Sequence, residues 1–331
     1  MRDKKFNIIV PCFNEQEALP ETIKVLLVEL DSLASLNLIE KDSSKIIFID
    51  DGSNDQTWDI LSKEIKEHKN ISGIKLTKNF GHQNALLAGM LESESDVLIT
   101  IDADLQDDSS VMADMLRDYH KGKEIVYGVR NNRSSDSFFK RKSAILFYKL
   151  FALLGAKVIY NHADFRLLSR KAINNLRKYN ESNLYLRGII PLIGLPSSTI
   201  KYKRFKRNKG ETKYNLTRMI ALSLSGITSF SYSPLRFISF LGLIISISSI
   251  LMVFYIFYIA LFTDKAIAGW TSTIVSIYFL GGIQLLSLGI IGEYLGKVFT
   301  ESKKRPNYLV TNEVRHIEIS LHVFKCRTIY N

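Results

Sequence analysis

Two long stretches without a charged residue, residues 237–262 and 266–292, constrain the fold of this chain more than any other feature. A helix needs about 20 apolar residues to cross the hydrocarbon core of a bilayer, and both stretches are longer. Because only residues 263–265 separate them, the pattern predicts a tight hairpin of two transmembrane helices. The rest of the chain is polar, so we expect a water-exposed head on a membrane anchor.

The charge distribution predicts how this hairpin is oriented. The net charge is +11, and basic residues flank both outer ends of the hairpin. By the positive-inside rule, the head and both termini then lie in the cytoplasm, and the protein is a multi-pass protein of the inner (plasma) membrane.

Seven lysine or arginine residues lie between positions 201 and 213, against Glu211 as the one acid. Alone, this cluster fits anionic lipid headgroups as well as a specific phosphate site. No recognition motif for nucleic acid accompanies it, so we expect no nucleic-acid partner.

The head alternates between two kinds of segment. Short apolar runs rich in β-branched residues occur at 7–10, 46–49, 74–76, 97–101 and 125–129. Amphipathic segments occur between or after them, at 17–36, 57–67, 83–92 and 110–121. This alternation predicts an α/β fold with a mostly parallel sheet that is covered on both faces.

Four parts follow along the chain. Residues 1–214 form the head, and residues 215–233 have the apolar spacing of an amphipathic helix at the membrane interface. Residues 234–296 hold the transmembrane hairpin, and residues 297–331 form a cytoplasmic tail without an interpretable pattern.

Acidic residues follow three of the predicted strands. Glu15 comes after the first, Asp50 and Asp51 after the second, and Asp102 and Asp104 after the fourth. Ligands of such sheets bind beyond the carboxyl ends of the strands, and clustered carboxylates repel one another unless a cation compensates them. One isolated carboxylate could be a turn or cap residue, but three acidic strand ends in series favour a site for Mg²⁺ or Mn²⁺.

Several segments together resemble one family of enzymes. They read PCFNE, IDDGSNDQT, KNFGHQNALLAG, DADLQDD, ADFRLLSRKA and RFKRNKGETKY, and two predicted spans follow them. In this combination the chain resembles family 2 glycosyltransferases of the GT-A fold, which is Rossmann-like. More narrowly, it is similar to polyprenyl-phosphate glycosyltransferases, the group of dolichol-phosphate mannose synthases and bacterial bactoprenol glucosyltransferases.

The resemblance implies a site for a nucleotide sugar. The residues that match the nucleotide pocket of the family are Pro11, Asn14, Glu15, Asp51 and Asp102. Those that match the ligands of the divalent ion are Asp102, Asp104 and Gln106. The ion would neutralise charge on the departing nucleoside diphosphate. His82 has no second histidine or cysteine nearby at ligand spacing, so we expect it to be a polar loop or helix-start residue.

The resemblance also implies a site for a lipid phosphate. Asp164 matches the candidate catalytic carboxylate of similar enzymes, beside Asp104 at the donor. A phosphate monoester is already mostly dianionic at neutral pH, so Asp164 could equally orient the acceptor or form a buried pair with Arg166 or Lys213. Five basic residues and one threonine are assigned to phosphate and acceptor binding: Arg130, Arg133, Arg204, Arg207, Thr212 and Lys213.

The predicted activity is the inverting transfer of a hexose to undecaprenyl phosphate at the cytoplasmic face, with UDP-glucose as the favoured donor. GDP-mannose, UDP-N-acetylhexosamine and a UDP-amino-arabinose remain alternative donors. A non-catalytic adaptor that binds lipid phosphate is the alternative from another class. Small residues in the spans would allow close helix packing within one chain or in a homo-oligomer: Gly242, Ser246, Gly289, Gly292 and Gly296.

Overall fold

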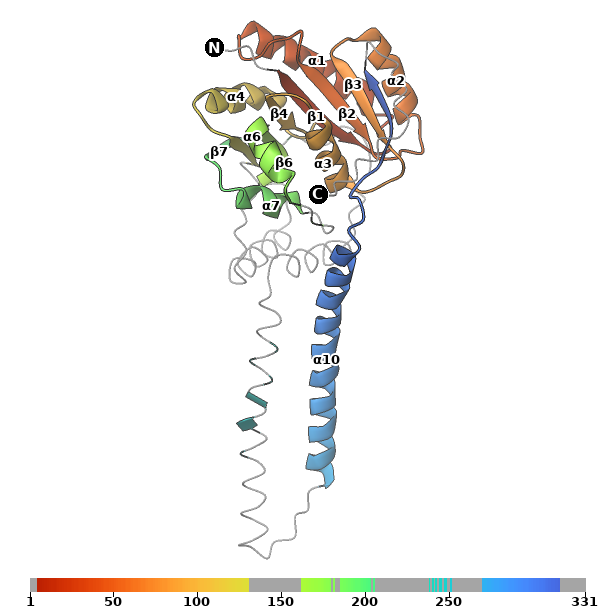
Figure 1. The fold of residues 1–331 in the computed structure, drawn as a ribbon, viewed down its shortest axis with the longest axis vertical. Coiled ribbons are helices and arrows are strands. Elements are labelled where there is room, and N and C mark those ends of the chain that lie inside the picture. The colour runs from red at the N-terminus through yellow and green to blue at the C-terminus, as the bar shows by residue number, and fades with distance from the viewer. Residues whose placement is uncertain are drawn as a thin grey trace, which may run out of the picture. The chain divides into compact units, whose positions relative to one another are not determined.

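The computed structural model describes residues 5–130, 162–179, 181, 185–203, 205 and 270–315, and scattered positions between 238 and 251. The chain divides into two compact units (Figure 1). The first unit contains every described strand together with the helices up to residue 192, and the second contains the long helix α10 (Trp270–Ser302).

Within the described residues, the first unit is built on an eight-stranded sheet in the order β7-β5-β6-β4-β1-β2-β3-β8. The four central strands β4, β1, β2 and β3 are parallel, whereas β6 and β8 run antiparallel to their neighbours. The prediction of an α/β fold with a mostly parallel sheet is therefore confirmed. The strands are β1 (Phe6–Cys12), β2 (Lys45–Asp50), β3 (Ile71–Leu76), β4 (Val97–Thr100), β5 (Ile125–Arg130), β6 (His162–Ser169), β7 (Ser197–Tyr202) and β8 (Val310–Arg315).

Helices cover the sheet, and the four predicted ones are present. They are α1 (Leu19–Ser35), α2 (Thr57–Glu67), α3 (His82–Glu92) and α4 (Met112–His120). The remaining described helices of this unit are the short η1 (Ser109–Val111), α6 (Arg170–Leu176) and α7 (Leu186–Leu192).

The central strands are mostly apolar because helices pack on both of their faces. Phe6, Ile8 and Val10 of β1 belong to one buried cluster with the apolar stripe of α1. Ile9, which points to the other face, lies against α3. Alternate residues of one strand thus enter opposite layers of core, which explains why β1 and β2 read as continuous apolar runs.

Gly89 sets how closely α3 approaches the sheet. A Cβ atom at this position would lie 2.3 Å from Cγ2 of Ile9 and 3.0 Å from Cγ1 of Ile49. No side chain larger than hydrogen fits there without a shift of the helix. Because α3 begins at the loop after β3, this packing fixes where the first residues of α3 stand at the edge of the sheet.

Three strands were not predicted from the sequence, namely β6, β7 and β8. The strands β7 and β8 lie at the two edges of the sheet, where polar residues face solvent and no apolar run is needed. β6 is buried but contains Asp164 and Arg166, which interrupt its apolar pattern. β8 lies in the segment after residue 306, where the sequence showed no interpretable pattern.

The second unit is described mainly through α10, which covers residues 270–302 of the chain. Within the part of the chain that the structure describes, no helix combines the length and the apolar character of a membrane span. Most of the predicted first span, residues 237–262, lies outside the described residues, and the predicted interfacial segment 215–233 lies wholly outside them.

Candidate active site

The loops after the four parallel strands gather at one edge of the sheet. The register pairs Cys12 with Asp50 and Ile9 with Thr100, so the carboxyl ends of β1, β2 and β4 lie at the same edge. Each of the four loops contains a residue with positive φ: Asn14 (54°), Gly52 (67°), Gly81 (92°) and Leu105 (50°). Sharp turns of this kind concentrate where a loop presents backbone and polar side chains to a ligand.

Hydrogen bonds tie the first loop to the second. The backbone N–H of Asn14 donates to Oγ of Ser53, and its side-chain Oδ1 accepts from the N–H of Asn54, both at 2.9 Å. The N–H of Glu15 donates to Oγ1 of Thr57 at 2.9 Å. Asn14 and Glu15, two of the predicted nucleotide-pocket residues, are therefore fixed beside the end of β2, and Pro11 is a buried residue of β1.

Asp51 shapes the third loop. Its two carboxylate oxygens accept the backbone N–H groups of Phe80 at 2.8 Å and of Gly81 at 2.9 Å. Burial raises the pKa of Asp51 above its usual value, although these two hydrogen bonds act in the opposite direction. Asp51 thus holds the turn that precedes α3 in place at the loop edge.

The turn after β4 carries Asp102, Asp104 and Gln106. Oγ1 of Thr22 donates to the carbonyl oxygen of Ala103 at 2.6 Å, which anchors the turn to α1. Oδ1 of Asp104 accepts the N–H of Gln106 at 3.3 Å across the left-handed Leu105. These contacts hold Asp102 and Asp104 on one rigid turn.

This turn fits a divalent cation. Oδ1 of Asp102 is buried, and no described group forms a hydrogen bond with it. Burial raises the pKa of Asp102 to about 6; His82 acts in the opposite direction, and the carboxylates of Asp164, Asp107 and Asp104 add to the upward shift. An oxygen that is buried without a hydrogen bond and lies among carboxylates is an environment that a bound cation relieves, even though Nε2 of His82 lies 3.5 Å away. Mg²⁺ is usually held by one or two carboxylates and by substrate phosphates, which matches Asp102 and Asp104.

Asp164 lies on β6 at the centre of a cluster of charges. Its Oδ1 accepts from Nη2 of Arg166 and, at 3.2 Å, from Nε of Arg187. Its Oδ2 accepts from Nη2 of Arg187 at 2.8 Å and from Nε2 of Gln83 at 3.4 Å. The Asp164–Arg166 pair considered from the sequence is therefore confirmed, whereas Lys213 lies outside the described residues.

The charges around Asp164 determine its protonation. Burial of the side chain would raise its pKa, but Arg166 and Arg187 outweigh burial and hold the pKa well below its usual range. Asp164 is therefore a carboxylate at neutral pH, and donors occupy both of its oxygens.

His82 connects this cluster to the carboxylates of the turn after β4. It is the first residue of α3, and its Nε2 lies 3.5 Å from Oδ1 of Asp102 and 3.6 Å from Oδ2 of Asp164. Partial burial lowers the pKa of His82, but Asp164 and Asp102 raise it to a net value above the usual one. From the sequence, His82 was expected to be a polar loop or helix-start residue, and the structure makes it the first residue of α3. Its contact with two acids was missed, because Asp164 is 82 positions away.

Arg130, a predicted acceptor residue at the end of β5, belongs to a separate group. Its Nη2 lies 3.0 Å from Oδ1 of Asp107, and its Nε donates to the hydroxyl of Tyr202 at 3.2 Å. The Tyr202 hydroxyl donates to the same Asp107 oxygen at 2.7 Å. The other predicted phosphate ligands, Arg133, Arg204, Arg207, Thr212 and Lys213, lie outside the described residues.

Phe205, which lies just beyond β7, contacts the turn after β4. The N–H of Phe205 donates to the carbonyl oxygen of Gln106 at 2.8 Å. This backbone contact joins the chain just beyond β7 to the turn that contains Asp102 and Asp104.

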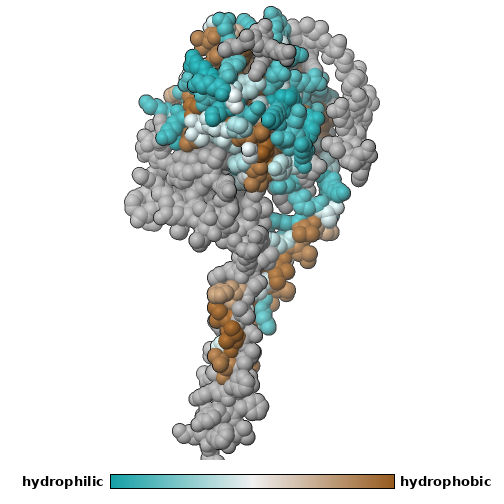
Figure 2. Space-filling model, turned by 60° about the vertical axis from the view of Figure 1, so that its left-hand side comes forward, coloured by the Kyte–Doolittle hydropathy of each residue, from teal (hydrophilic) through white to brown (hydrophobic). Residues whose placement is uncertain are grey.

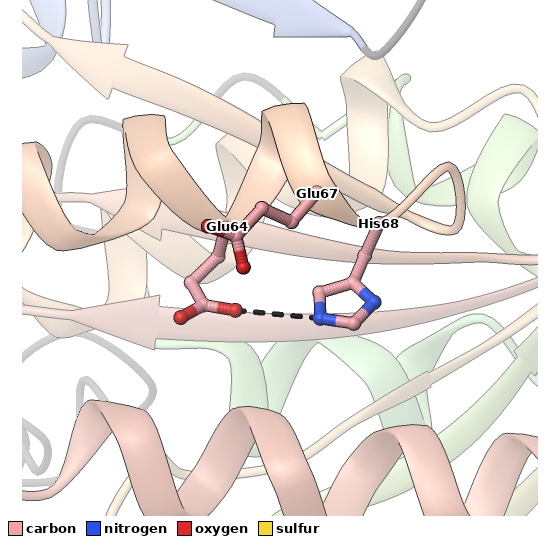
Figure 3. A group of neighbouring side chains, drawn as sticks. All are labelled: Glu64, Glu67 and His68. Carbon is pink, nitrogen blue, oxygen red and sulfur yellow. Dashed lines mark ion pairs between the residues drawn. The ribbon is translucent and has the colours of Figure 1, made fainter.

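Among the described residues, one group of three side chains has the spacing of metal ligands, Glu64, Glu67 and His68 (Figure 3). Nε2 of His68 lies 3.6 Å from Oε2 of Glu64, one helical turn earlier. The group lies at the end of α2, just before β3 begins at Ile71, and thus at the edge of the sheet opposite to the loops described above. We interpret it as a solvated surface pair and not as part of the site.

Gln83 and Arg187 were not identified from the sequence. The rule that ligands bind beyond the strand ends could have pointed to Gln83, which lies in the first turn of α3. No local pattern marks Arg187, because its partner Asp164 is on β6 and the contact exists only in the folded chain.

Comparisons with known proteins agree with this geometry. The family model described as glycosyl transferase family 2 matches residues 7–177. The chain is 48% identical over 319 residues to the uncharacterized glycosyltransferase YkoT of Bacillus subtilis, covering 95% of this chain and 93% of the relative.

Two further relatives carry more specific names. The prophage bactoprenol glucosyl transferase homolog of Escherichia coli is 36% identical over 307 residues, covering 92% of this chain and 98% of the relative. The bactoprenol glucosyl transferase of Shigella phage SfV is 36% identical over 310 residues, covering 93% of this chain and 99% of the relative. With a family model that matches more than half of its length and relatives that span nearly all of it, the chain belongs to glycosyl transferase family 2.

Proposed function

We propose that this glycosyltransferase transfers a hexose from a nucleotide sugar to undecaprenyl phosphate, with UDP-glucose as the donor. The observation that carries the proposal is the pairing of two side-chain groups at one loop edge. The carboxylates Asp102 and Asp104 suit a cation-bound diphosphate, and the neighbouring cluster of Asp164, Arg166 and Arg187 supplies positive charge beside them. Relatives named bactoprenol glucosyl transferase, 36% identical over nearly the whole chain, support this choice of acceptor.

In this proposal the donor lies across the loops after β1, β2 and β4. Asn14, Glu15 and Asp51 border the nucleotide with Pro11 beneath them, and Asp102, Asp104 and Gln106 would hold Mg²⁺ or Mn²⁺. The ion, when bound, supplies positive charge that stabilises the departing nucleoside diphosphate.

The transfer itself needs no general base. An oxygen of the acceptor phosphate forms a bond with the anomeric carbon, and the bond from that carbon to the diphosphate oxygen breaks, its electron pair leaving with UDP. Attack from the opposite face inverts the configuration and gives a β-linked sugar. A phosphate monoester is mostly dianionic at neutral pH, so there is no proton to remove. Asp164, whose oxygens are already occupied by guanidinium groups, then acts by orienting these groups.

The acceptor is a lipid, so we place the site at the cytoplasmic face of the membrane and keep the hairpin of residues 237–262 and 266–292 as a proposal. Supporting it, large apolar side chains of α10 are exposed along its described part, among them Leu285 (72%) and Leu288 (66%). Figure 2 shows hydrophobic surface on the described residues of this second unit. Water does not favour such a surface, whereas acyl chains do. Membrane insertion with both termini in the cytoplasm and segment 215–233 at the interface would account for it.

A donor panel tests the proposal. Purified full-length protein is incubated with undecaprenyl phosphate, Mg²⁺ and labelled UDP-glucose, GDP-mannose, UDP-N-acetylglucosamine or a UDP-amino-arabinose. We expect labelled lipid from UDP-glucose. Transfer from only one of the other nucleotide sugars would contradict the assignment of UDP-glucose and identify that sugar nucleotide as the donor. Transfer from none of them would contradict the enzymatic proposal. A non-catalytic adaptor should also show no nucleotide-dependent stabilisation that requires a divalent cation.

A further inference from the structure

The guanidinium of Arg187 forms a bidentate pair with Asp164. Its Nε and one Nη2 hydrogen point to the two oxygens of Asp164, so that Asp164 binds one side of the planar group. A guanidinium has five N–H donors, and this contact uses two. Within the described residues, no group accepts a hydrogen bond from Nη1 or from the second hydrogen of Nη2, and we call these two groups the free edge.

The side chain of Arg187 is partly accessible to solvent. The side chain of Arg187 is 35% exposed, whereas those of Asp164 (5%) and Arg166 (0%) are buried. Arg187 is therefore the one member of this cation pair that a ligand can reach from solvent.

The charge around Asp164 favours an anion at this position. One carboxylate is shared between two guanidinium groups, since Arg166 also binds Oδ1 of Asp164. Asp102, the other acid that His82 contacts, is committed to the cation in the proposed function. Positive charge on Arg187 then remains uncompensated until a second anion arrives.

Neighbouring contacts fix the orientation of Arg187. Gln83 accepts the backbone N–H of Leu186 through Oε1 at 3.1 Å and donates to Asp164 through Nε2 at 3.4 Å. The residues Leu186, Gly188 and Ile189 are buried, which packs α7 into the core of the first unit. A pre-organised fork of this kind matches the geometry of two phosphate oxygens.

We propose that Arg187 is a phosphate-binding residue of the site and that Asp164, held by Arg166, is its positioning residue. The inference rests on the proposed function, which brings two phosphorylated substrates to this edge of the sheet. The ligand class is a phosphate group, and it has two sources: the monoester of the lipid acceptor and the diphosphate of the donor.

The test measures anion affinity without turnover. Calorimetry on the full-length protein in Mg²⁺ gives dissociation constants for geranyl phosphate, which stands for the acceptor, and for UDP, which stands for the donor. The variants are Arg187→Gln, which removes the charge, and Arg187→Lys, which keeps the charge but cannot form the two-sided fork. Because charge-assisted bidentate contacts are strong, Arg187→Gln should weaken one of the two probes at least about tenfold, and Arg187→Lys should weaken it less.

Arg170→Gln is the matched control. Arg170 is also partly buried, and its guanidinium donates to the carbonyl oxygens of Ser93 and Ser95, just before β4 begins. It thus lies at the opposite end of the strands from the proposed site. This variant should lower the midpoint of thermal unfolding and leave both affinities within twofold of the wild type.

The outcomes separate the phosphate sources and the competing explanations. Weaker geranyl phosphate binding with unchanged UDP binding assigns Arg187 to the acceptor, and the reverse assigns it to the donor. Unchanged affinities in a folded Arg187→Gln protein overturn the inference and leave a purely structural ion pair. If Arg187→Gln does not fold, the Arg187→Lys variant tests the inference instead. Its affinity for one of the two probes must then be weaker than that of the wild type by at least about threefold. Wild-type protein that binds neither probe contradicts the proposed function and this inference with it.

Discussion

At the scale of single residues, carboxylates of the same chemical type differ in their hydrogen-bond partners and therefore in their expected roles. Both oxygens of Asp51 and both oxygens of Asp164 accept hydrogen bonds, so these carboxylates hold other groups in place. Asp102 has a buried oxygen without a hydrogen-bond partner in the described chain, and Asp104 makes one weak contact with a backbone N–H. The first pair should therefore matter for structure, and the second pair for binding of the donor.

Replacement of Asp104 tests this division. We expect Asp104→Ala to lower sugar transfer at least about 100-fold, since a ligand of the charge-stabilising ion is lost. The thermal midpoint should change little, because Asp104 is only half-buried. Asp114→Ala, which removes an exposed partner of Arg117, is the control and should leave transfer unchanged. Full transfer by Asp104→Ala would reject its assignment as a metal ligand.

Replacement of Asp164 tests the structural pair and gives a pH dependence. Asp164→Asn leaves Arg166 buried without its anion, so it should destabilise the protein by about 3–5 kcal/mol at neutral pH. The pKa of Asp164 is lower in the folded protein than in the unfolded chain, so its contribution to stability is present above the unfolded value of about 4 and is lost as the pH falls towards the folded pKa.

The corresponding measurement follows thermal midpoints of both proteins between pH 8 and pH 3. The difference between wild type and Asp164→Asn should stay constant down to about pH 5 and shrink below pH 4. Asp42→Asn, which removes the exposed partner of Lys69, should show no comparable difference at neutral pH. A difference that grows on acidification would contradict the assignment of Asp164 as an ionised, positively paired group.

At the scale of elements, α3 is the part that connects packing to the site. Its Gly89 allows close contact with Ile9, and its first residues, His82 and Gln83, contact the site carboxylates. Gly89→Ala should destabilise the protein by about 1–3 kcal/mol through overpacking, and it should also reduce transfer because the start of α3 moves. Thermal unfolding and transfer assays measure the two effects. Lys63→Ala, on the exposed side of α2, is the control, and an equal stability of Gly89→Ala and wild type would contradict the close packing.

The sequence predicted the elements whose pattern is local and left out those whose pattern is not. The strands from β1 to β5 and the helices from α1 to α4 are visible as apolar periodicity, because each buries its side chains in the core. The edge strands β7 and β8 lack an apolar run because most of their side chains are exposed to solvent or only partly buried. β6 is buried, but Asp164 and Arg166 interrupt its apolar pattern. These two charged side chains can be buried because they pair with each other.

The site divides in the same way. Asp102, Asp104 and Asp51 follow predicted strands directly, so the topology of a parallel sheet was enough to bring them to one edge. The roles of His82 and Arg187 depend on contacts with Asp164 that span 82 and 23 positions. Such contacts follow from the antiparallel insertion of β6 beside β4, which no local pattern predicts.

At the scale of the whole molecule, the proposed function requires a catalytic unit that reaches a lipid substrate. The proposed hairpin predicts that the full-length protein stays in the membrane fraction after extraction with alkaline carbonate, since two apolar spans bind far more tightly than surface charge does. A protein held only by the basic residues between 201 and 213 should be released by high salt or by carbonate. Release into the supernatant would contradict the proposed hairpin.

The central claim is that the cation-binding carboxylates and a lipid phosphate meet at one edge of the sheet. It is tested most directly by incubating the purified full-length protein with labelled UDP-glucose and either undecaprenyl phosphate or undecaprenol, with and without Mg²⁺. The account predicts labelled lipid only when both the phosphate and the divalent ion are present. Equal labelling of undecaprenol, or labelling that persists when chelators remove the ion, would contradict it.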